Sequence, residues 1–491
     1  MGPIVLLLET IMTTSTLAIP TPGIRIADRG LLISVAASLP AGGLLAASYA
    51  LHPLWWAAWL APIALLAATA GRARNLWTTS AIAGATATLP LIPYYLSLLG
   101  PGLVANVIVL RILLLLLALG LTRFATARLP LGLAMLVFPG AVAAIEQIML
   151  ATSVNGAAGS IAYSQSDMPG LIQVAALGGV PAVAFLVLLP GSLVGLLLTR
   201  VWPAAQRVGA IAGLVLLGLA VALFSAVHMR RDADQVRAVM LATDRFQGIP
   251  TDWNKVWNAY APAVAKEAPR GGLVVLPEKI ALLDAGAAAA ATRDVAIAAK
   301  ATGATLVVGV EVKGDIYRNR ALIASPDGRT AWYDKQRMVP GLEARDKPGT
   351  TPFFSEIGGV PFGVAICKDM HIPSIGREYA GRVGLMAVPA WDFGRDGWMG
   401  ARMTAMRAVE SGYAIARAAR DGLVGGYDSA GRVIGEARSV DGMAVARMSM
   451  PATVRSTLYG RIGDLFGWVC VAGMALLAGW AGIAVLRRVR N

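Results

Sequence analysis

The sequence predicts an integral membrane protein that carries one α/β layered domain between its last two membrane-spanning segments. Three observations predict this fold class. The chain of 491 residues is 56% hydrophobic and only 15% charged, which lies outside the range of soluble proteins. Its N-terminal 228 residues contain apolar stretches long enough to cross a bilayer, and one more lies near the C-terminus. Between them, short strand-like runs alternate with alanine-rich helical stretches.

Eight apolar stretches are predicted to span the membrane, seven in the N-terminal part and one at the C-terminal end. The residues before Pro20 are apolar but carry Glu9 and lack a basic start, so they are left unassigned. The predicted domains are therefore residues 1–228, residues 229–463, and the last helix with its basic tail at 464–491. The eight stretches are residues 31–50, 53–70, 77–99, 104–122, 130–152, 171–199, 207–228 and 465–486.

Arginines recur at every second connection between these stretches, while the intervening connections contain no lysine or arginine. The positive-inside rule therefore places both termini in the cytoplasm and residues 229–463 on the outer side. The formal charge of +14 is interpreted as this topology signal, because no lysine-rich run with interleaved aromatic residues indicates nucleic-acid binding. The arginines are Arg25, Arg29, Arg72, Arg74, Arg123, Arg128, Arg200, Arg207, Arg487, Arg488 and Arg490.

The predicted α/β domain is defined by five strand-like runs of apolar and β-branched residues. Two turn signals, Ser325–Gly328 and Asp428–Gly431, separate further strand candidates. Helical stretches between the runs predict a layered domain of about 230 residues. The runs cover residues 236–241, 273–276, 305–310, 360–366 and 385–388.

Metal and disulfide chemistry are not expected from the cysteines and histidines. The chain has two cysteines, Cys367 and Cys470, and three histidines. Neither a disulfide framework nor zinc-ligand spacing can be built from them. We predict no metal and no cofactor.

Glu278 and Lys335 each follow a strand-like run, where α/β proteins commonly hold functional side chains. Glu278 would suit a general base, and Lys335 would suit stabilisation of a tetrahedral oxyanion. Each also has a simpler interpretation as a surface charge. Glu278 could be a solvated glutamate beside Lys279, and Lys335 could pair with a neighbouring carboxylate, Asp334 or Glu343.

Cys367 ends the run before a polar turn, so it could be a small core residue or a nucleophile. The residues that follow at once, Lys368, Asp369 and His371, favour the nucleophile. Nearby cations lower the pKa of a thiol, and we expect them to favour the thiolate here. Acid/base group, cation and thiol together suit acyl transfer through a thioester.

The order Glu278, Lys335, Cys367 resembles the nitrilase superfamily, and within it the membrane-embedded apolipoprotein N-acyltransferases. The segment from Lys335 to Glu343 is similar to the lysine segment of that family, which implies that Glu343 is an auxiliary acid. Phe246-Gln247-Gly248-Ile249-Pro250 followed by Trp253 resembles the family's segment near the substrate cleft. The loop from Asn155 to Pro169 and the run Ala390–Gly394 also resemble family segments.

Two short motifs depart from the family pattern. The usual Trp-Pro-Glu-Thr is replaced by Leu276-Pro277-Glu278-Lys279, and the usual Cys-Tyr-Glu is replaced by Cys367-Lys368-Asp369. The second is closer to soluble nitrilase relatives. These departures predict a divergent member and leave the acceptor open.

The resemblance implies an extracytoplasmic αββα nitrilase-like sandwich and a multi-pass protein of the bacterial cytoplasmic (inner) membrane. It implies transfer of a phospholipid acyl chain, through a Cys367 thioester, to the α-amino group of S-diacylglyceryl-cysteine lipoproteins. The implied partners are a phospholipid donor, a diacylated lipoprotein acceptor and the membrane, with no nucleic acid and no cofactor. The oxyanion or substrate-proximal residues that it implies are Lys368, Asp369, Trp253 and Trp391.

Two other functions remain open. The first is a membrane-tethered nitrilase-like amidase or acyltransferase that acts on a different amine or amide, including the relatives found in conjugal transfer systems. The second is a channel-like or assembly scaffold in which the trio is residual. Arg111 and Glu146, which lie inside apolar stretches, would either pair with each other or act at a lipid-headgroup entrance.

Overall fold

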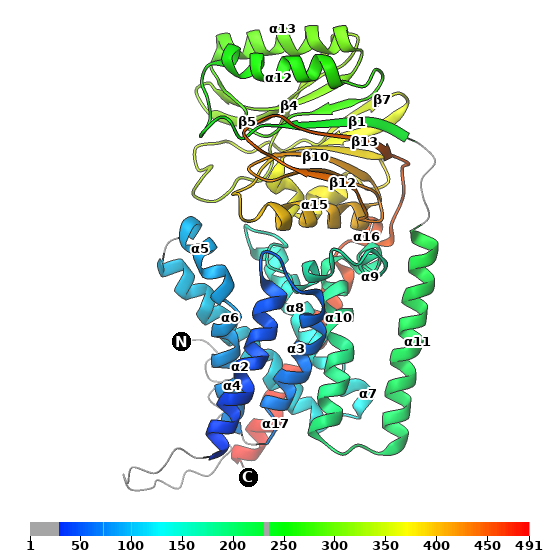
Figure 1. The fold of residues 1–491 in the computed structure, drawn as a ribbon. Coiled ribbons are helices and arrows are strands. Elements are labelled where there is room, and N and C mark those ends of the chain that lie inside the picture. The colour runs from blue at the N-terminus through cyan, green and yellow to red at the C-terminus, as the bar shows by residue number, and fades with distance from the viewer. Residues whose placement is uncertain (1–28, 72, 100, 230–234, 491) are drawn as a thin grey trace.

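The computed structural model describes residues 29–71, 73–99, 101–229 and 235–490. A layered α/β body lies above a helical bundle in Figure 1, and the chain passes between them after α11 and again after β13. The segment before Pro20, Arg25 and Arg72, which entered the topology prediction, lie outside the described residues.

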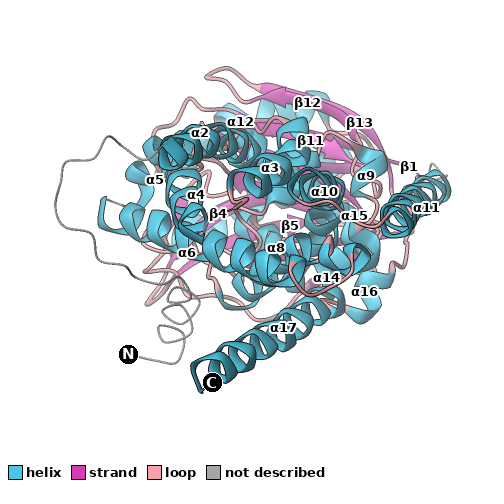
Figure 2. Ribbon diagram, turned by 90° about the horizontal axis from the view of Figure 1, so that it is seen from below, coloured by secondary structure: helices cyan, strands magenta, loops and turns pink. Residues whose placement is uncertain are grey.

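The helical bundle is built from residues 29–228 and from the C-terminal helix. Helices α3 and α10 pack along each other near its centre, whereas α11 and α17 lie at its edge (Figure 2). The helices are α2 (Arg29–Tyr49), α3 (Trp55–Ala68), α4 (Ala73–Thr86), α5 (Ile92–Leu99), α6 (Pro101–Thr126), α7 (Leu131–Ala134), α8 (Val137–Thr152), α9 (Pro169–Ile172), α10 (Ala175–Thr199), α11 (Ala204–His228) and α17 (Leu465–Arg490), with 3-10 turns η1 (Leu89–Leu91) and η2 (Ile161–Gln165).

Three of the predicted spans are interrupted, and the stretch 130–152 is divided at Met135 and Leu136 into α7 and α8. The stretch 77–99 is divided by η1 into α4 and α5, because Pro90 and Pro93 each lack the backbone N–H that a continuous helix needs. The stretch 171–199 is broken at Gly178 and Gly179, where Gly179 has a φ of 71°. Glycine adopts this left-handed conformation without the strain that a Cβ would add.

Five helices in the described part of the chain are long and apolar enough to cross a membrane. The apolar helix Trp55–Ala68 is shorter, and the other two predicted spans of the N-terminal part, 31–50 and 77–99, are not among the five. Several apolar helices of membrane-spanning length are therefore confirmed, and the count of eight stays a prediction. The five are Val104–Thr126, Leu131–Thr152, Ala175–Thr199, Ala204–His228 and Leu465–Arg487.

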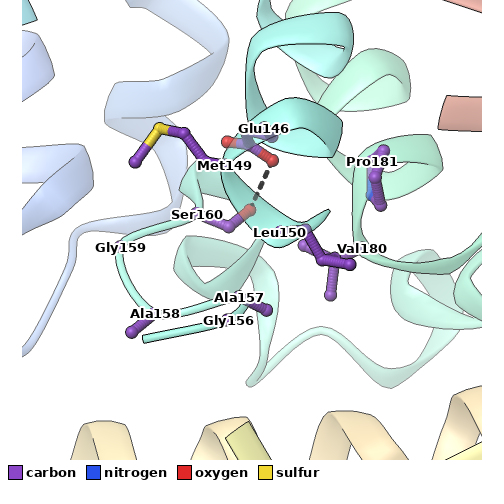
Figure 3. Close-up of a pocket in the computed structure, with 10 residues that line it drawn as sticks. All are labelled: Glu146, Met149, Leu150, Gly156, Ala157, Ala158, Gly159, Ser160, Val180 and Pro181. Carbon is purple, nitrogen blue, oxygen red and sulfur yellow. Dashed lines mark hydrogen bonds between the residues drawn. The ribbon is translucent and has the colours of Figure 1, made fainter. Parts of the chain in front are cut away.

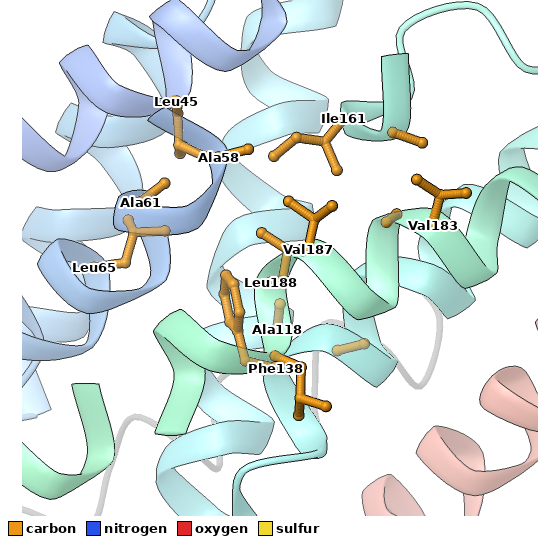
Figure 4. Close-up of a cluster of buried hydrophobic side chains, with 14 of the residues drawn as sticks. Leu45, Ala58, Ala61, Leu65, Ala118, Phe138, Ile161, Val183, Val187 and Leu188 are labelled. Atoms are coloured by element: carbon orange, nitrogen blue, oxygen red, sulfur yellow. The ribbon is translucent and has the colours of Figure 1, made fainter. Parts of the chain in front are cut away.

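The bundle core consists of small and branched apolar side chains that come from helices far apart in the sequence. Leu65 of α3, Phe138 of α8 and Leu188 of α10 meet in it (Figure 4). Small residues permit close helix contact: a Cβ on Gly191 of α10 would lie 2.3 Å from the carbonyl oxygen of Trp59 in α3. Van der Waals packing of this kind holds helices together where lipid provides no hydrophobic driving force.

The α/β body contains two twisted sheets. The first has the order β13-β1-β2-β4-β5-β6, with β3 on β4, and the second has the order β12-β11-β10-β9-β8-β7. Central pairs are parallel and outer pairs antiparallel. The strands are β1 (Gln235–Ala242), β2 (Leu273–Val275), β3 (Leu282–Leu283), β4 (Thr305–Lys313), β5 (Tyr317–Ala324), β6 (Thr330–Asp334), β7 (Phe353–Ile357), β8 (Val360–Val364), β9 (Leu385–Trp391), β10 (Ala414–Arg420), β11 (Leu423–Tyr427), β12 (Val433–Arg438) and β13 (Ala444–Pro451).

Alternation along the strands divides the buried side chains into layers. In β1, Ala238 and Met240 face the core between the two sheets, whereas Val239 and Leu241 face the helices outside the first sheet. Helices cover both outer faces, which gives the predicted α-β-β-α order of layers (Figure 1). These helices are α12 (Trp253–Glu267), α13 (Ala285–Thr302), α14 (Pro373–Glu378) and α15 (Gly397–Ser411), with α16 (Leu458–Ile462) leading into α17.

The five strand runs predicted from the sequence are confirmed as β1, β2, β4, β8 and β9, with bounds shifted by a few residues. Both predicted turns are confirmed: Ser325–Gly328 joins β5 to β6, and Asp428–Gly431 joins β11 to β12. The boundaries predicted for the three domains stay a prediction.

Helix α15 forms the main contact between the α/β body and the bundle. Glu410 of α15 accepts a hydrogen bond from the backbone N–H of Val180 (2.9 Å), directly after the break in α10. Arg407 pairs with Glu410 (2.9 Å) and donates to the Tyr163 hydroxyl in η2 (3.2 Å). The broken end of a membrane helix is thus capped by a side chain of the α/β body.

Candidate active site

Glu278 lies three residues beyond the end of β2 and is buried, with 3% of its surface exposed. Pro277 ends the strand, and the backbone N–H of Glu278 bonds to the carbonyl of Ala390 in the second sheet (3.2 Å). The carboxylate therefore lies between the two sheets. The interpretation of Glu278 as a solvated surface residue is wrong.

Lys335 follows β6 directly and is only 1% exposed. Its Nζ donates to Glu278 Oε1 (2.6 Å) and to Glu343 Oε2 (2.8 Å). Asp334 points elsewhere, to Arg318 and Arg320. Lys335 is therefore a buried ammonium shared by two carboxylates, and these carboxylates raise its pKa although burial alone would lower it.

Cys367 begins a short 3-10 turn, η3 (Cys367–His371), after β8. Its φ of 44° lies in the left-handed region, which non-glycine residues adopt rarely and mostly at functional sites. The sulfur contacts the carbonyl oxygen of Trp391 at 3.6 Å. The strained turn presents the thiol at the end of its strand, beside the ends of β2 and β9.

The thiol of Cys367 is not converted to a thiolate by its surroundings. Burial raises its pKa well above 9, the negative charge of Glu278 adds to this, and Lys335 opposes it. The expectation that nearby cations would favour the thiolate is therefore wrong, because desolvation outweighs them. A base must take the proton when the sulfur reacts, and Glu278 is the carboxylate whose charge acts most strongly on the thiol.

Asp369 connects the turn that begins at Cys367 to the lysine segment. Its carboxylate accepts hydrogen bonds from the Tyr333 hydroxyl (2.8 Å) and from the backbone N–H groups of Gln336 (3.0 Å), Arg337 (2.8 Å) and Ile366 (2.9 Å). Burial raises the pKa of Asp369 to about 6, although these donors oppose the shift. Asp369 thus fixes where the lysine and cysteine segments meet.

A second ammonium, Lys279, lies on the other side of Glu343. It contacts Glu311 (3.1 Å), Glu343 (3.0 Å) and Asp346 (2.8 Å), and only 6% of its side chain is exposed. Burial would lower the pKa of Lys279, but the carboxylates, Glu343 first, raise it above 10.5. The lysine that departs from the family pattern thus completes a buried charge network.

Glu343 receives more donors than Glu278. Besides the two lysines, Asn319 Nδ2 (2.7 Å) and the Val339 N–H (2.7 Å) bond to it, and the pKa of Glu343 falls to about 2 because the two lysines and these bonds outweigh its burial. Asn319 also donates to Glu278 Oε1 (2.5 Å). Within the described residues no hydrogen bond reaches Glu278 Oε2. Glu343 is therefore a fixed anion, and Glu278 keeps one oxygen for a proton.

The two predicted tryptophans differ in their relation to the trio. Trp391 contributes its carbonyl to Cys367, and its ring lies under the Arg420 guanidinium, 4.1 Å from the centroid. Trp253 begins α12, stacks on Trp257, and donates to Asp294 of α13 (2.8 Å). The structure thus brings Trp391 to Cys367 and buries Trp253 in the helix layer outside the first sheet.

A loop of the helical bundle completes the site from below. Asn155 Oδ1 accepts a hydrogen bond from Lys368 Nζ (2.8 Å), and the N–H of Ala157 bonds to the His371 carbonyl (3.1 Å). Gly156, with φ of 57°, lies so close that a Cβ would come 2.5 Å from the same carbonyl. The turn Cys367–His371 therefore packs directly on the membrane half.

Glu146 of α8 holds this loop in place. Its carboxylate accepts hydrogen bonds from the Ser160 hydroxyl (2.6 Å) and the Ile161 N–H (3.0 Å), and it lines a small hollow between the loop, α8 and the break in α10 (Figure 3). Arg111 bonds instead to the Ala87 carbonyl (2.9 Å) and lies over the Tyr49 ring. The predicted Arg111–Glu146 ion pair is therefore wrong.

The membrane half is similar to a known protein family. Residues 41–193 match the apolipoprotein N-acyltransferase N-terminal domain. A curated apolipoprotein N-acyltransferase of Geobacter metallireducens is 30% identical over 190 residues, and one of Bradyrhizobium diazoefficiens is 29% identical over 193 residues. Over part of its length the chain is therefore similar to the apolipoprotein N-acyltransferases.

The similarity to these family members is partial. The alignments cover 34% and 33% of this chain, and 36% and 34% of the two relatives. The chain thus spans about a third of the length of the curated relatives that it matches. Activity, substrates and partners are treated below as proposals.

The α/β body is similar to solved structures of the CN-hydrolase superfamily at low identity. A superfamily protein of Xanthomonas campestris is 18% identical, with a TM-score of 0.39 over 44% of this chain and 91% of that chain. An amidase of Nesterenkonia sp. is 23% identical, with a TM-score of 0.39 over 45% of this chain and 92% of that chain.

Several residues of the candidate site were not predicted from the sequence. Asn319 joins the two carboxylates, and the only signal for it is an amide inside a strand, where asparagine is depleted. Glu311 and Asp346 are recognisable only once Lys279 is known to be buried. Asn155 lies 213 positions from its partner Lys368, so local pattern carries no information about the contact.

Proposed function

We propose that the protein transfers an acyl chain from a phospholipid, through a thioester on Cys367, to the N-terminal α-amino group of a diacylglyceryl-cysteine lipoprotein. The supporting observation is the Glu278–Lys335 ion pair of 2.6 Å, buried beside the Cys367 turn in a chain whose membrane half matches this family. A base, a cation and a thiol suit acyl transfer without a cofactor.

In the proposed first step, Glu278 takes the proton from the Cys367 sulfur as the sulfur attacks an ester carbonyl of the phospholipid. Lys335 and the backbone N–H of Lys368 stabilise the oxyanion. The carbon–oxygen bond to glycerol then breaks, and Glu278 returns its proton to the leaving oxygen. The products are a lysophospholipid and an acyl-thioester on Cys367.

In the second step, the acceptor amine attacks the thioester and Glu278 accepts the ammonium proton. The carbon–sulfur bond breaks, and the sulfur recovers a proton. Glu343 keeps its charge throughout, because its pKa of about 2 lies far below neutral pH. It thereby holds Lys335 in place for both steps.

The proposal assigns residues 1–228 and 464–491 to about eight membrane spans and residues 229–463 to a catalytic domain on the outer side of the bacterial inner membrane. Support comes from arginines at alternate connections and from five apolar helices of membrane-spanning length in the described residues. A site next to the bundle lies near the headgroups, where both substrates keep their acyl chains in lipid.

Intact-mass analysis of the full-length protein after incubation with phospholipid tests the chemistry. We expect an acyl adduct on the wild type, sensitive to hydroxylamine, and none on Cys367→Ala. Cys470→Ala is the matched control, because Cys470 lies in α17, outside the α/β body, and should retain the adduct. An equal adduct on Cys367→Ala would refute the thioester.

A second candidate function is a membrane-tethered nitrilase-like amidase or acyltransferase acting on another amine or amide. The observation that favours it is the Cys367-Lys368-Asp369 sequence, which is closer to soluble nitrilase relatives. Mass spectrometry of lipoproteins from cells that depend on this protein distinguishes the two. Unmodified α-amino groups there would exclude the lipoprotein acceptor and favour the second function.

A further inference from the structure

Three buried lysines surround the candidate site, and one of them lacks a counter-charge. Lys335 contacts two carboxylates and Lys279 contacts three. Lys368 is also buried, with 4% of its surface exposed, but the partner of its Nζ is the neutral amide oxygen of Asn155. Among the residues that the structure describes, no carboxylate forms an ion pair with Lys368.

A buried ammonium without an anion is costly, because an amide oxygen replaces only part of the lost hydration. The pKa of Lys368 reflects this cost. Burial lowers the pKa most, the positive charge of Lys335 lowers it further, and the resulting value is about 8. Below that pH the group is still a cation. An anionic ligand would supply the negative counter-charge for Lys368 that the protein itself does not provide.

Lys368 lies next to a second point of contact with the membrane half. The neighbouring His371 lies in the same turn, and its carbonyl bonds to Ala157 of the bundle loop. Burial lowers the pKa of His371 to about 3, and positive charges, that of Lys368 first, lower it further. These charges are those of Lys368, Arg417, Lys335 and Arg407.

The position of Lys368 defines what kind of anion can reach it. The residue adjoins the nucleophile in sequence and contacts the bundle loop in space. A ligand there must offer an acyl carbonyl to Cys367 and an anion a few atoms away, and it must arrive from the membrane. A glycerophospholipid has this arrangement, because its phosphodiester is attached to the carbon next to the acylated ones.

We propose that Lys368 binds the phosphodiester of the phospholipid donor while an ester carbonyl of that lipid lies at Cys367. Asn155 Oδ1 accepts a hydrogen bond from the Lys368 ammonium before the lipid arrives. Once the lipid is bound, the ammonium donates both to Asn155 and to the phosphodiester. Lys368 would thus select donors that carry a phosphate. This inference rests on the proposed function and names the donor feature that the site recognises.

The test compares two acyl donors in the full-length protein. Mixed micelles contain either a phospholipid or a diacylglycerol with the same chains, and the rate of adduct formation on Cys367 is measured with each. The wild type should prefer the phospholipid. Lys368→Met should lower this preference by about 10- to 100-fold, the factor expected for losing a charge-assisted hydrogen bond.

Two variants separate recognition from folding. Lys368→Arg should keep most of the preference, because a guanidinium also binds phosphate. Lys300→Met, an exposed lysine of α13 outside the first sheet, is the matched control and should behave as the wild type. If diacylglycerol is too slow a donor, dialkyl ether analogues of both lipids serve as competitive inhibitors, and their relative potency gives the same ratio.

The outcomes separate the two proposals. A wild-type adduct together with an unchanged preference in Lys368→Met overturns the phosphodiester assignment and leaves the thioester chemistry intact. A wild type that forms no adduct from any donor overturns the proposed function. If inorganic phosphate at about 10 mM, near the weak end of ordinary ligand affinities, abolishes the preference, the site binds free phosphate and the lipid assignment is wrong.

Discussion

Replacing Lys279 by methionine tests the buried charge network most directly. Methionine keeps much of the length of the side chain and removes only its charge and donors. Glu311, Glu343 and Asp346 would then lose a cation that lies 2.8–3.1 Å from each of them. Three carboxylates would remain close together with Lys335 and the half-exposed Arg345 as the nearest cations.

The expected loss of stability follows from the geometry. Removing one partner of a buried ion pair costs about 3–5 kcal/mol. The pKa of Glu343 gives an independent scale, because its fall from 4.5 to about 2 corresponds to about 3 kcal/mol in favour of the charged form, shared among Lys279, Lys335 and two further donors. We therefore expect Lys279→Met to lose about 3 kcal/mol or more at pH 7.

The free energy of unfolding should depend on pH in a direction that the pKa of Glu343 determines. A carboxyl whose pKa is lowered on folding stabilises the fold above its unfolded pKa, and this stabilisation disappears as the pH falls through its folded pKa. For Glu343 the window runs from about pH 4.5 down to about 2. The difference between wild type and Lys279→Met should be complete at pH 7 and should shrink below pH 4.5.

Urea unfolding of the full-length protein in detergent micelles, followed by near-UV circular dichroism, measures the effect. Lys313→Met is the matched control, because Lys313 lies on the same strand as Glu311 but is exposed, and its loss should cost under about 0.5 kcal/mol. A cost below about 1 kcal/mol for Lys279→Met, or a difference that grows in acid, would refute the proposed charge network.

Three further predictions concern the nucleophile and its support. Glu278→Gln should abolish acyl transfer yet speed alkylation of Cys367 by iodoacetamide at pH 8, because removing the negative charge lowers the thiol pKa; slower alkylation would contradict this. Gly156→Ala should lower the acylation rate at least tenfold, since its Cβ would press on the His371 carbonyl, and an unchanged rate would disprove the close contact. Glu410→Gln should lower the thermal midpoint in detergent, because it leaves the buried Arg407 guanidinium without its anion. It should also expose α15 to proteolysis, and unchanged cleavage would count against the contact of Glu410 with α10.

Much of the fold could be predicted because hydrophobic period is a local property. The run Leu273–Leu276 alternates between two buried layers and is confirmed as β2, and the apolar stretch 207–228 is confirmed as α11. The interruptions were harder to predict. Gly178 and Gly179 are tolerated in many membrane helices, and they break α10 here because Glu410, which is distant in sequence, satisfies the freed N–H of Val180.

The trio of the candidate site could be predicted from the sequence, but the effect of burial on its charges could not. The order of Glu278, Lys335 and Cys367 was readable from three short segments, because each follows a strand. The direction of the pKa shift on Cys367 could not be predicted, because it depends on how deeply the thiol is buried. The polar residues Lys368, Asp369 and His371 that follow it gave no sign of this burial. The burial of Lys279 was not predicted either, because its partners Glu311, Glu343 and Asp346 are distant in sequence.

The capped break in α10 has a consequence for how the protein is made. The N–H of Val180 enters the membrane early in synthesis, whereas Glu410 is translated 230 residues later and reaches the outer side only after α11 in the proposed topology. Helix α17, synthesised last, then packs on α8 where Gly467 leaves room for Gln147. The bundle must therefore wait, partly assembled, until the α/β body has folded. Assembly of the protein thus begins and ends with helices of the bundle. A nascent chain stalled before α15 would leave the end of α10 at Val180 without its cap, and a chaperone or protease would recognise that end.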